Sequence, residues 1–136
     1  MMNEPHDIAN ITLWAGSVQA AVTAIRKAGA TTQMILLPGT DFTSAETFIS
    51  NGSAGNLSVV ANPDGSKTGL IFDVHKYLDF DNSWTHLECV ANHINDSFAP
   101  LATFLKADNR KAMLSEIGGS SNQSVSCQVS SNGAEC

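Results

Sequence analysis

Positive charge is scarce in this chain of 136 residues. Seven lysines and arginines stand against thirteen aspartates and glutamates, which gives a formal net charge of −6 at pH 7. Without a basic cluster to neutralise phosphates, we expect neither nucleic acid nor an anionic membrane as a partner. No apolar run approaches the roughly 20 residues that a membrane-spanning helix needs.

Cofactor signatures are missing as well. The sequence has no phosphate-binding loop, serine elbow or dinucleotide fingerprint. His86, His93 and Glu88 invite comparison with a metal site, but they lie in a polar stretch without a strong ligand spacing. We therefore expect no cofactor and no metal.

Cysteines are few and odd in number. Cys89, Cys127 and Cys136 leave one thiol without a partner inside the chain, and their spacing is not that of a zinc site. Five Asn-x-Ser/Thr sequons occur, at Asn10, Asn51, Asn56, Asn95 and Asn122. A chain rich in Asn, Ser and Thr forms such triplets by chance, yet with the cysteines they favour a secreted, extracellular protein. The first residues do not resemble a signal peptide, so we expect a mature chain or a fragment.

Short apolar runs alternate with segments of helical periodicity. Apolar residues at helical spacing predict helices over 7–29 and 98–108, and a capping-box pattern predicts a short helix over 43–49. Apolar runs predict buried strands over 33–37, 70–75 and 112–114, and residues 1–2 read as the end of another strand. The segment from 51 to 62 has a mixed pattern.

This alternation predicts an α/β fold with parallel strands and crossover helices. Four such units amount to half of a TIM (β/α)₈ barrel, which typically has about 250 residues. We therefore expect residues 1–119 to form a partial barrel. Residues 120–136 form a polar Ser/Asn-rich tail with cysteines that continues into a missing part of the barrel.

Two glutamates follow apolar runs directly. Glu4 precedes a proline, and Glu116 precedes a pair of glycines. Active sites of β/α barrels lie at the carboxyl ends of the strands, and a retaining glycoside hydrolase needs two carboxyl groups about 5–5.5 Å apart there. A single glutamate is usually a solvated surface charge. That explanation is weaker here, because two separate glutamates would each have to follow an apolar run by chance.

Other side chains near these runs have two explanations each. His75 is either a structural, hydrogen-bonded residue or a ligand of substrate or carboxylate, and Tyr77 is either a loop aromatic or a helper of the site. His6 either orients Glu4 or caps the following helix. Trp84 either lines a sugar subsite or anchors its loop.

Four motifs resemble glycoside hydrolase family five, in particular the fungal secreted endo-β-1,4-glucanases. The segment 3–7 (NEPHD) is similar to the acid/base motif of that family. Residues 18–31 (VQAAVTAIRKAGAT), 71–79 (IFDVHKYLD) and 114–119 (LSEIGG) resemble fungal members in order and spacing. The resemblance implies a retaining enzyme that cleaves internal bonds of cellulose or a related β-glucan through a glycosyl-enzyme intermediate.

The resemblance also implies individual roles. Glu4 is the expected acid/base and Glu116 the nucleophile, with His75 and Tyr77 as helpers and Asn3 as a hydrogen-bonding partner of the sugar 2-hydroxyl. Phe42 stands where fungal members often have tryptophan, and would stack on a sugar with less surface. A disulfide between Cys89 and Cys127 and a monomeric full-length protein are implied too.

Three alternatives stay open at this stage. Strands that the resemblance leads us to expect are absent from the chain, so it is either catalytic, a non-catalytic carbohydrate-binding remnant, or an inactive fragment from a partial reading frame. The substrate is equally open between cellulose, mixed-linkage glucan, mannan and xyloglucan.

Overall fold

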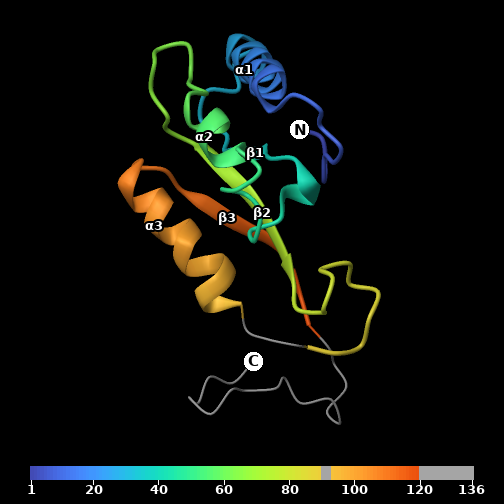
Figure 1. The fold of residues 1–136 in the computed structure, drawn as a ribbon. Helices are drawn as coiled ribbons and strands as arrows, with labels where there is room; N and C mark the ends of the chain where they lie inside the picture. Colours follow the sequence, from blue (N-terminus) through green and yellow to red (C-terminus); the bar gives the residue numbers. More distant parts are fainter. Residues whose placement is uncertain (90–92, 120–136) are drawn as a thin grey trace.

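Three parallel strands form one sheet. The structure, a computed structural model, describes residues 1–89 and 93–119. Strands β1 (Ile35–Pro38), β2 (Leu70–Tyr77) and β3 (Ala112–Gly118) lie in the order β1-β2-β3, so that strands neighbouring in sequence also neighbour in space (Figure 1). Parallel strands in sequential order with helices between them are the arrangement of a β/α barrel. The expectation of a partial barrel is confirmed.

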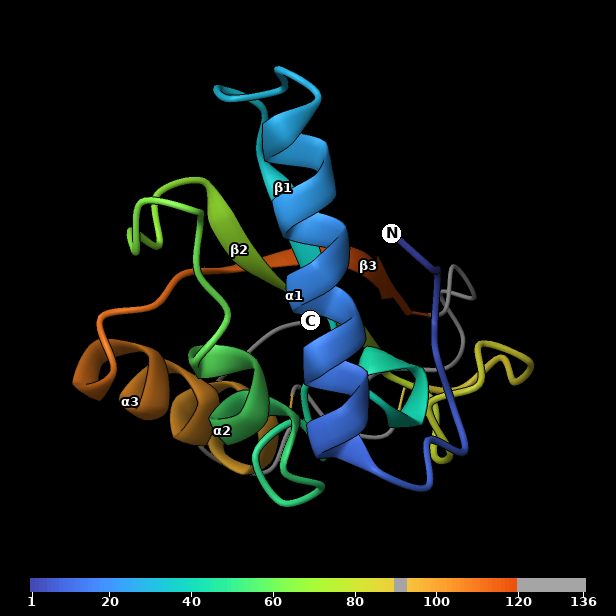
Figure 2. The same cartoon turned by 90° about the horizontal axis from the view of Figure 1, so that it is seen from above.

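Helix α1 (Ile11–Lys27) precedes the sheet and runs alongside β1 (Figure 2). It begins later than predicted because the Asn10 side chain caps it, accepting hydrogen bonds from the backbone N–H groups of Thr12 and Leu13 at 3.1 and 3.0 Å. Arg26 and Lys27 occupy its last turn, where positive charge suits the helix dipole.

The helix predicted over 43–49 is wrong. Residues Asp41–Thr43 form a single 3₁₀ turn, and the next residues join the sheet instead: the Ala45 N–H donates to the His75 carbonyl at 2.9 Å. The capping pattern failed because Ser44 is extended and the Thr43 hydroxyl, which should cap the helix, instead accepts from the Gly39 N–H and donates to the Asp73 carbonyl. The short helix comes later, as α2 (Ser53–Ser58), in the segment whose pattern was mixed.

The third helix agrees with its pattern. Helix α3 (Ala99–Ala107) follows a π-helical turn, η2 (Ile94–Phe98), and Pro100 lies in its first turn, where no backbone donor is lost. Strands β2 and β3 both extend further toward their carboxyl ends than their apolar runs suggested. Among the extra residues are Tyr77 of β2 and Glu116 of β3, which belong to the site.

A single hydrophobic core fills the space between the helices and one face of the sheet. Leu70, Phe72 and Val74 alternate along β2 and are almost completely buried. The core is completed by residues of the helices, of β1 and of the connecting loops: Ala15, Val18, Val22, Ile35, Leu37, Ala45, Phe48, Ala54, Leu57, Val60 and Leu101. The residues between Leu70, Phe72 and Val74 on β2 therefore point to the opposite face, which is the interior side of a barrel.

The strand predicted to end at Glu4 does not form. Met1 and Met2 are half exposed and pair with no strand among the described residues. They do line a hollow with Leu36 and Pro38, so the segment lies beside β1 without joining it. Within residues 1–89 and 93–119, no helix has the length and apolar character needed to cross a membrane.

The long loop after β2 carries the only cysteine in the described part of the chain. Cys89 is 4% exposed and is not a free thiol. Cys127, Cys136 and the whole of the tail 120–136 lie outside the described residues, so the pairing with Cys127 and the boundary at residue 119 stay predictions.

Candidate active site

Strand β2 presents Asp73, His75 and Tyr77 to the face opposite the core. The ladder with β3 pairs Val74 with Leu114 and then His75 with Glu116, so Ser115 is an extra residue in β3. Such a bulge changes which side chain faces the partner strand, and bulges are common beside active sites. Here it brings Glu116, rather than Ser115, opposite His75.

A loop rather than a strand positions Glu4. Pro5 is fully buried, and its carbonyl accepts a hydrogen bond from the Phe42 N–H at 3.0 Å. The Ile8 N–H donates to the Thr40 hydroxyl at 3.3 Å. Glu4 itself has a φ of 42°, in the left-handed region that ordinary residues rarely adopt. These contacts hold the N-terminal segment against the turn after β1 and direct the Glu4 side chain toward β2.

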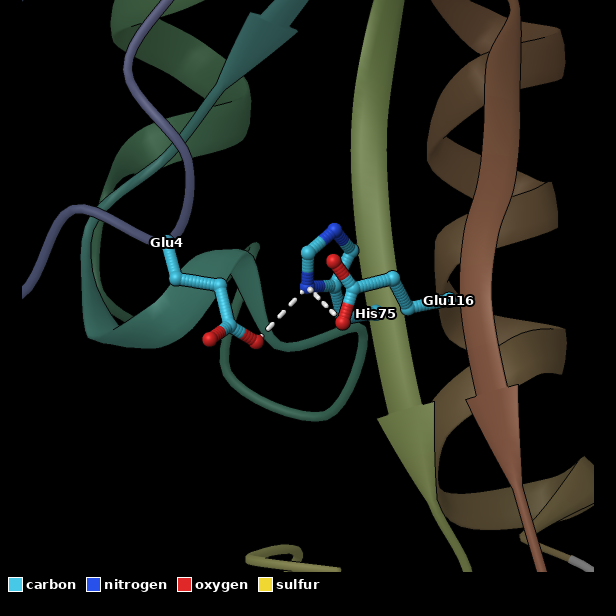
Figure 3. A group of neighbouring side chains, drawn as sticks. All are labelled: Glu4, His75 and Glu116. Atoms are coloured by element: carbon cyan, nitrogen blue, oxygen red, sulfur yellow. Dashed lines mark hydrogen bonds and ion pairs between the residues drawn. The ribbon is translucent and has the colours of Figure 1, made fainter.

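Glu4 and Glu116 meet at His75. The imidazole Nδ1 lies 2.8 Å from Glu4 Oε1 and 3.5 Å from Glu116 Oε2 (Figure 3). One oxygen of each carboxylate and the imidazole nitrogen all lie within 4.8 Å of one another. His75 is 3% exposed, whereas about a third of each glutamate side chain is exposed to solvent. The two acids thus face each other across an immobilised imidazole while remaining accessible to a ligand.

Tyr77 supports Glu116 directly. Its hydroxyl donates a hydrogen bond to Glu116 Oε2 at 2.7 Å. This hydrogen bond to an anion, together with burial and the nearby charges, raises the pKa of Tyr77 to about 12, so the phenol keeps its proton. The ring also fixes the sequence after the acid: a Cβ at Gly118 would lie 2.8 Å from Tyr77 Cδ1, so only glycine fits there.

Sequence analysis missed Asp73. Its side chain is 8% exposed, accepts a short hydrogen bond from the Ser115 hydroxyl, and has Oδ1 3.8 Å from His75 Nε2. Asp73 lies two residues before His75 on the same face of β2, so the strand alternation was a signal that could have found it. It links the bulged residue of β3 to the histidine between the two acids.

A second missed group surrounds Lys76. Its ammonium is fully buried and donates to Glu46 Oε2 at 2.7 Å and to the Asn82 side-chain oxygen. The hydrogen bond from Lys76 is the main cause of the lowered pKa of Glu46. No local pattern predicts a buried lysine here, because its anionic partner Glu46 lies thirty residues earlier in the sequence.

The predicted sugar-binding aromatics line one open cavity together with Glu4. Glu4, His75, Tyr77, Phe42 and Trp84 all border a cavity of about 530 Å³. Phe42 is 50% and Trp84 67% exposed, and the Trp84 indole stacks on Tyr77 with ring centroids 6.0 Å apart. Exposed aromatic faces beside paired carboxylates are typical of a site that holds a sugar ring.

Glu116 touches the cavity residues His75 and Tyr77 without lining the cavity itself, and two further predicted residues also lie outside it. His6 stacks on Phe42 at 4.8 Å and contacts Asp7 at 2.8 Å, so it supports the aromatic ring and does not contact Glu4. Asn3 borders a separate hollow beside β1, and its side chain makes no hydrogen bond within the described part of the chain. The structure therefore does not bring Asn3 together with the two acids.

Among the residues that the structure describes, two clusters have side chains that a metal ion could use. One is Glu4, His75 and Glu116 themselves, and the other consists of Asp79, Asp81 and His86 in the loop after β2. Of the residues that suggested a metal site in the sequence, only His86 belongs to a cluster. His93 instead contacts Asp96 at 3.0 Å, close to the start of α3.

Known proteins resemble this chain over almost its whole length. The family model described as Cellulase (glycosyl hydrolase family 5) matches residues 1–134. The chain is 63% identical over 124 residues to endoglucanase EG-II of Hypocrea jecorina, covering 91% of this chain and 29% of that protein. It is 51% identical over 126 residues to the manganese dependent endoglucanase Eg5A of Phanerodontia chrysosporium, covering 91% of this chain and 32% of the relative.

Solved structures agree with these relatives. The crystal structure of Cel5A (EG2) from Hypocrea jecorina superposes with a TM-score of 0.87 at 63% identity, over 90% of this chain and 37% of that one. The chain thus spans about a third of the length of the relatives it matches. The match over residues 1–134 and the shared fold show that this chain belongs to glycosyl hydrolase family 5, the cellulases.

Proposed function

We propose that this chain carries the catalytic pair of a retaining endo-β-1,4-glucanase, with Glu4 as acid/base and Glu116 as nucleophile. The observation that carries the proposal is the approach of the two carboxylates to within 4.8 Å. Retaining enzymes hold their carboxyl groups about 5–5.5 Å apart, whereas inverting enzymes leave about 6.5–9.5 Å for a water molecule. The spacing here favours the retaining arrangement.

In the first step, Glu116 attacks the anomeric carbon while Glu4 gives its proton to the leaving glycosidic oxygen. The carbon–oxygen bond to the leaving sugar breaks, and an ester bond to Glu116 forms. Tyr77 donates to Glu116 Oε2, which holds the carboxylate in place before the attack. The high pKa of Tyr77 keeps that donor protonated throughout the working pH range.

In the second step, Glu4 accepts a proton from a water molecule that attacks the same carbon from the other face. The ester to Glu116 breaks, and the sugar leaves with its original anomeric configuration. His75 contacts both acids through Nδ1 and is buried, so it orients the pair while the proton passes between Glu4 and substrate.

The proposed substrate is cellulose or a related β-1,4-glucan. Phe42 and Trp84 offer exposed rings on the border of the cavity, and stacking on such rings suits the apolar faces of glucose units. Hydrogen bonding of Asn3 to the sugar 2-hydroxyl stays part of the proposal on the strength of the resemblance. The names of the relatives, which call them endoglucanases, support the choice of substrate class.

We also propose a secreted, monomeric protein with a Cys89–Cys127 disulfide and glycans on some sequons. Asn10 and Asn95 are exposed, and neither uses its side-chain nitrogen in a hydrogen bond with another described residue. Asn51 and Asn56 are half buried, and their side-chain nitrogens donate to backbone carbonyls, so they are poorer acceptors of a glycan.

The test uses the protein expressed from its complete coding sequence. Glu116→Gln should lower kcat on a soluble β-1,4-glucan by about 10⁴-fold or more, as removal of a covalent nucleophile does in other hydrolases. Glu4→Gln should lower it by about 10²–10⁴-fold. Glu88→Gln is the matched control, because that glutamate is not part of the cluster formed by Glu4, His75 and Glu116.

A substrate with a good leaving group separates the two roles. An aryl glycoside needs no proton to depart, so Glu4→Gln should still form the glycosyl-enzyme in a rapid burst, while Glu116→Gln should not. The anomer released first by the unaltered protein, followed by NMR, should have the configuration of the substrate. Near-normal glucan hydrolysis by either glutamine variant, or an inverted product, contradicts the proposal.

The competing candidate is a carbohydrate-binding protein without activity. The chain spans less than a third of the length of endoglucanase EG-II. In a whole β/α barrel, groups from the remaining strands also contribute to the site, so a chain of this length could bind a sugar without cleaving it. Calorimetric titration with cello-oligosaccharides, beside a reducing-sugar assay, separates the two. Binding without release of sugar selects the non-catalytic candidate.

A further inference from the structure

Three side chains converge in the loop that follows β2 and form a cluster that includes neither Glu4 nor Glu116. The loop extends beyond the carboxyl ends of β2 and β3 (yellow in Figure 1). His86 Nδ1 lies 3.4 Å from Asp79 Oδ2 and 3.3 Å from Asp81 Oδ1. One potential ligand atom from each of the three residues lies within 4.8 Å of the other two.

The Asp79 carboxylate is buried and incompletely satisfied. The residue is 3% exposed. Its Oδ2 accepts long hydrogen bonds from the backbone N–H of His86, at 3.3 Å, and from the Ser83 hydroxyl, at 3.4 Å. Its Oδ1 is buried and has no hydrogen-bond donor in the part of the chain that the structure describes. A buried carboxylate oxygen without a partner is costly, so this position calls for a positive group.

A protonated His86 does not fully supply that group. An imidazolium would interact with Asp79 Oδ2 and Asp81 Oδ1 through the single N–H at Nδ1, and Asp79 Oδ1 would still lack a partner. The hydroxyl of Thr85 also lies 3.2 Å from Nδ1. Several oxygens therefore surround one nitrogen that can donate a single hydrogen bond, which is the arrangement expected when a cation replaces the proton.

The donor set indicates which cation fits. One imidazole nitrogen and two carboxylates suit first-row divalent ions such as Mn²⁺ and Zn²⁺, whereas Ca²⁺ and Mg²⁺ prefer sites made entirely of oxygen.

We propose that Asp79, Asp81 and His86 form a binding site for a first-row divalent metal ion, which fixes the loop that carries Trp84. Asp81 and Trp84 both border the cavity that Glu4 and His75 line, and Trp84 stacks on Tyr77. The ion takes no part in bond cleavage. It holds the indole against one wall of the cavity, and the proposal stands whether or not Glu4 and Glu116 are catalytic.

The first experiment measures Mn²⁺ binding to the metal-free protein, expressed from its complete coding sequence, by electron paramagnetic resonance. Asp81→Asn and His86→Gln remove ligands from the accessible side of the site and avoid the buried Asp79, so the variants should fold. Each should weaken Mn²⁺ binding by about 10-fold or more, since changes even to residues behind the ligands of a metal cost about 10–100-fold. Far-ultraviolet circular dichroism checks the fold of each variant.

Two controls locate the ion. Glu116→Gln alters the other candidate cluster and should leave Mn²⁺ affinity unchanged, as should His93→Gln, which changes a histidine outside both clusters. Undetectable binding, equal affinity in the Asp81→Asn and His86→Gln variants, or loss of binding in Glu116→Gln would each overturn the proposal.

The second experiment tests the effect on the loop. Zn²⁺ is not paramagnetic, so its binding should change the tryptophan emission through the environment of the indole and not through quenching by unpaired electrons. Trp84→Phe should abolish this change while leaving Mn²⁺ affinity intact, because the indole is no ligand. An emission change of the same size in Trp84→Phe would contradict the proposed action on Trp84.

Discussion

A titration of the Tyr77 phenol can test how the two acids are arranged, because its hydroxyl is hydrogen-bonded to Glu116. The Tyr77 hydroxyl donates to Glu116 Oε2 at 2.7 Å, and its pKa is raised from the usual value of 10.0 to about 12. The hydrogen bond to Glu116 is the largest cause, burial follows, and the charge of Glu4 contributes least. Replacing each acid by glutamine should therefore lower the pKa of Tyr77 by unequal amounts.

We expect Glu116→Gln to return the pKa of Tyr77 most of the way to 10, and Glu4→Gln to lower it only slightly. A glutamine at 116 still accepts a hydrogen bond but no longer repels the phenolate. The assay is the near-ultraviolet absorbance of tyrosinate as pH rises, recorded as the difference between each protein and its Tyr77→Phe counterpart. That subtraction isolates Tyr77 from any other tyrosine.

The same shift has a consequence for stability. Below pH 10 the phenol is protonated in both the folded and the unfolded chain, so its contribution is fully present there. It is lost as pH rises toward 12, where only the folded state keeps the proton. A shift of two units corresponds to about 2.7 kcal/mol, and the partial exposure of both side chains reduces this to about 1–2 kcal/mol.

Two results would refute this reasoning. One is a Tyr77 pKa near 10 in the unaltered protein, which would mean that the phenol does not contact Glu116 in solution. The other is an equal decrease in the Glu4→Gln and Glu116→Gln variants, which would mean that general negative charge, and not the hydrogen bond, raises the pKa.

Three further perturbations test the surroundings of the site. Ser115→Ala removes the hydrogen bond to the Asp73 carboxylate and should lower the free energy of unfolding by about 1.5 kcal/mol, measured in urea. Glu46→Gln should destabilise the fold by about 1–3 kcal/mol at pH 7, because it leaves the buried Lys76 ammonium without its anion, although Asn82 still accepts from it. Since the pKa of Glu46 is lowered in the fold, its contribution is present above its usual pKa of 4.5 and is lost as pH falls below it, so the difference between the two proteins should shrink in acid-range thermal melts. Phe48→Ala empties a fully buried position and should cost about 3–5 kcal/mol, and a loss under 1 kcal/mol in urea unfolding would contradict the described core.

Periodicity predicted the regular elements because their signals are local. Helix α1 and strand β2 follow from residues that are neighbours in the sequence, since a stripe at helical spacing or a short apolar run needs no distant partner to be recognised. The helix predicted over 43–49 failed because Ser44 bridges to His75 and the expected cap, Thr43, hydrogen-bonds to Asp73, both partners some thirty residues later. A competition of that kind is invisible to a local pattern.

The residues of the site also fall into two groups, those predicted from local patterns and those recognised only in the folded structure. Glu4, Glu116 and His75 were identified because each follows an apolar run, and the structure brings these three together. The prediction of a strand before Glu4 was wrong. Glu4 nevertheless lies beside His75, because the buried Pro5 and its hydrogen bond to the turn after β1 position it. Lys76 and Asp73 depend on partners from other elements, so their roles emerged only from the fold.

Because of the bulge at Ser115, the approach of Glu116 to Glu4 depends on the number of residues in β3. Side chains alternate between the faces of a strand, so the number of residues between Leu114 and Glu116 decides whether the carboxylate enters the barrel or turns toward the helices. Substitutions along β3 leave that number unchanged, whereas deletion or insertion of one residue reverses the orientation of everything after it. We therefore expect this short stretch to accept changes of residue type far more readily than changes of length, and a transplant of the acid pair to another β/α scaffold must carry the extra residue with it.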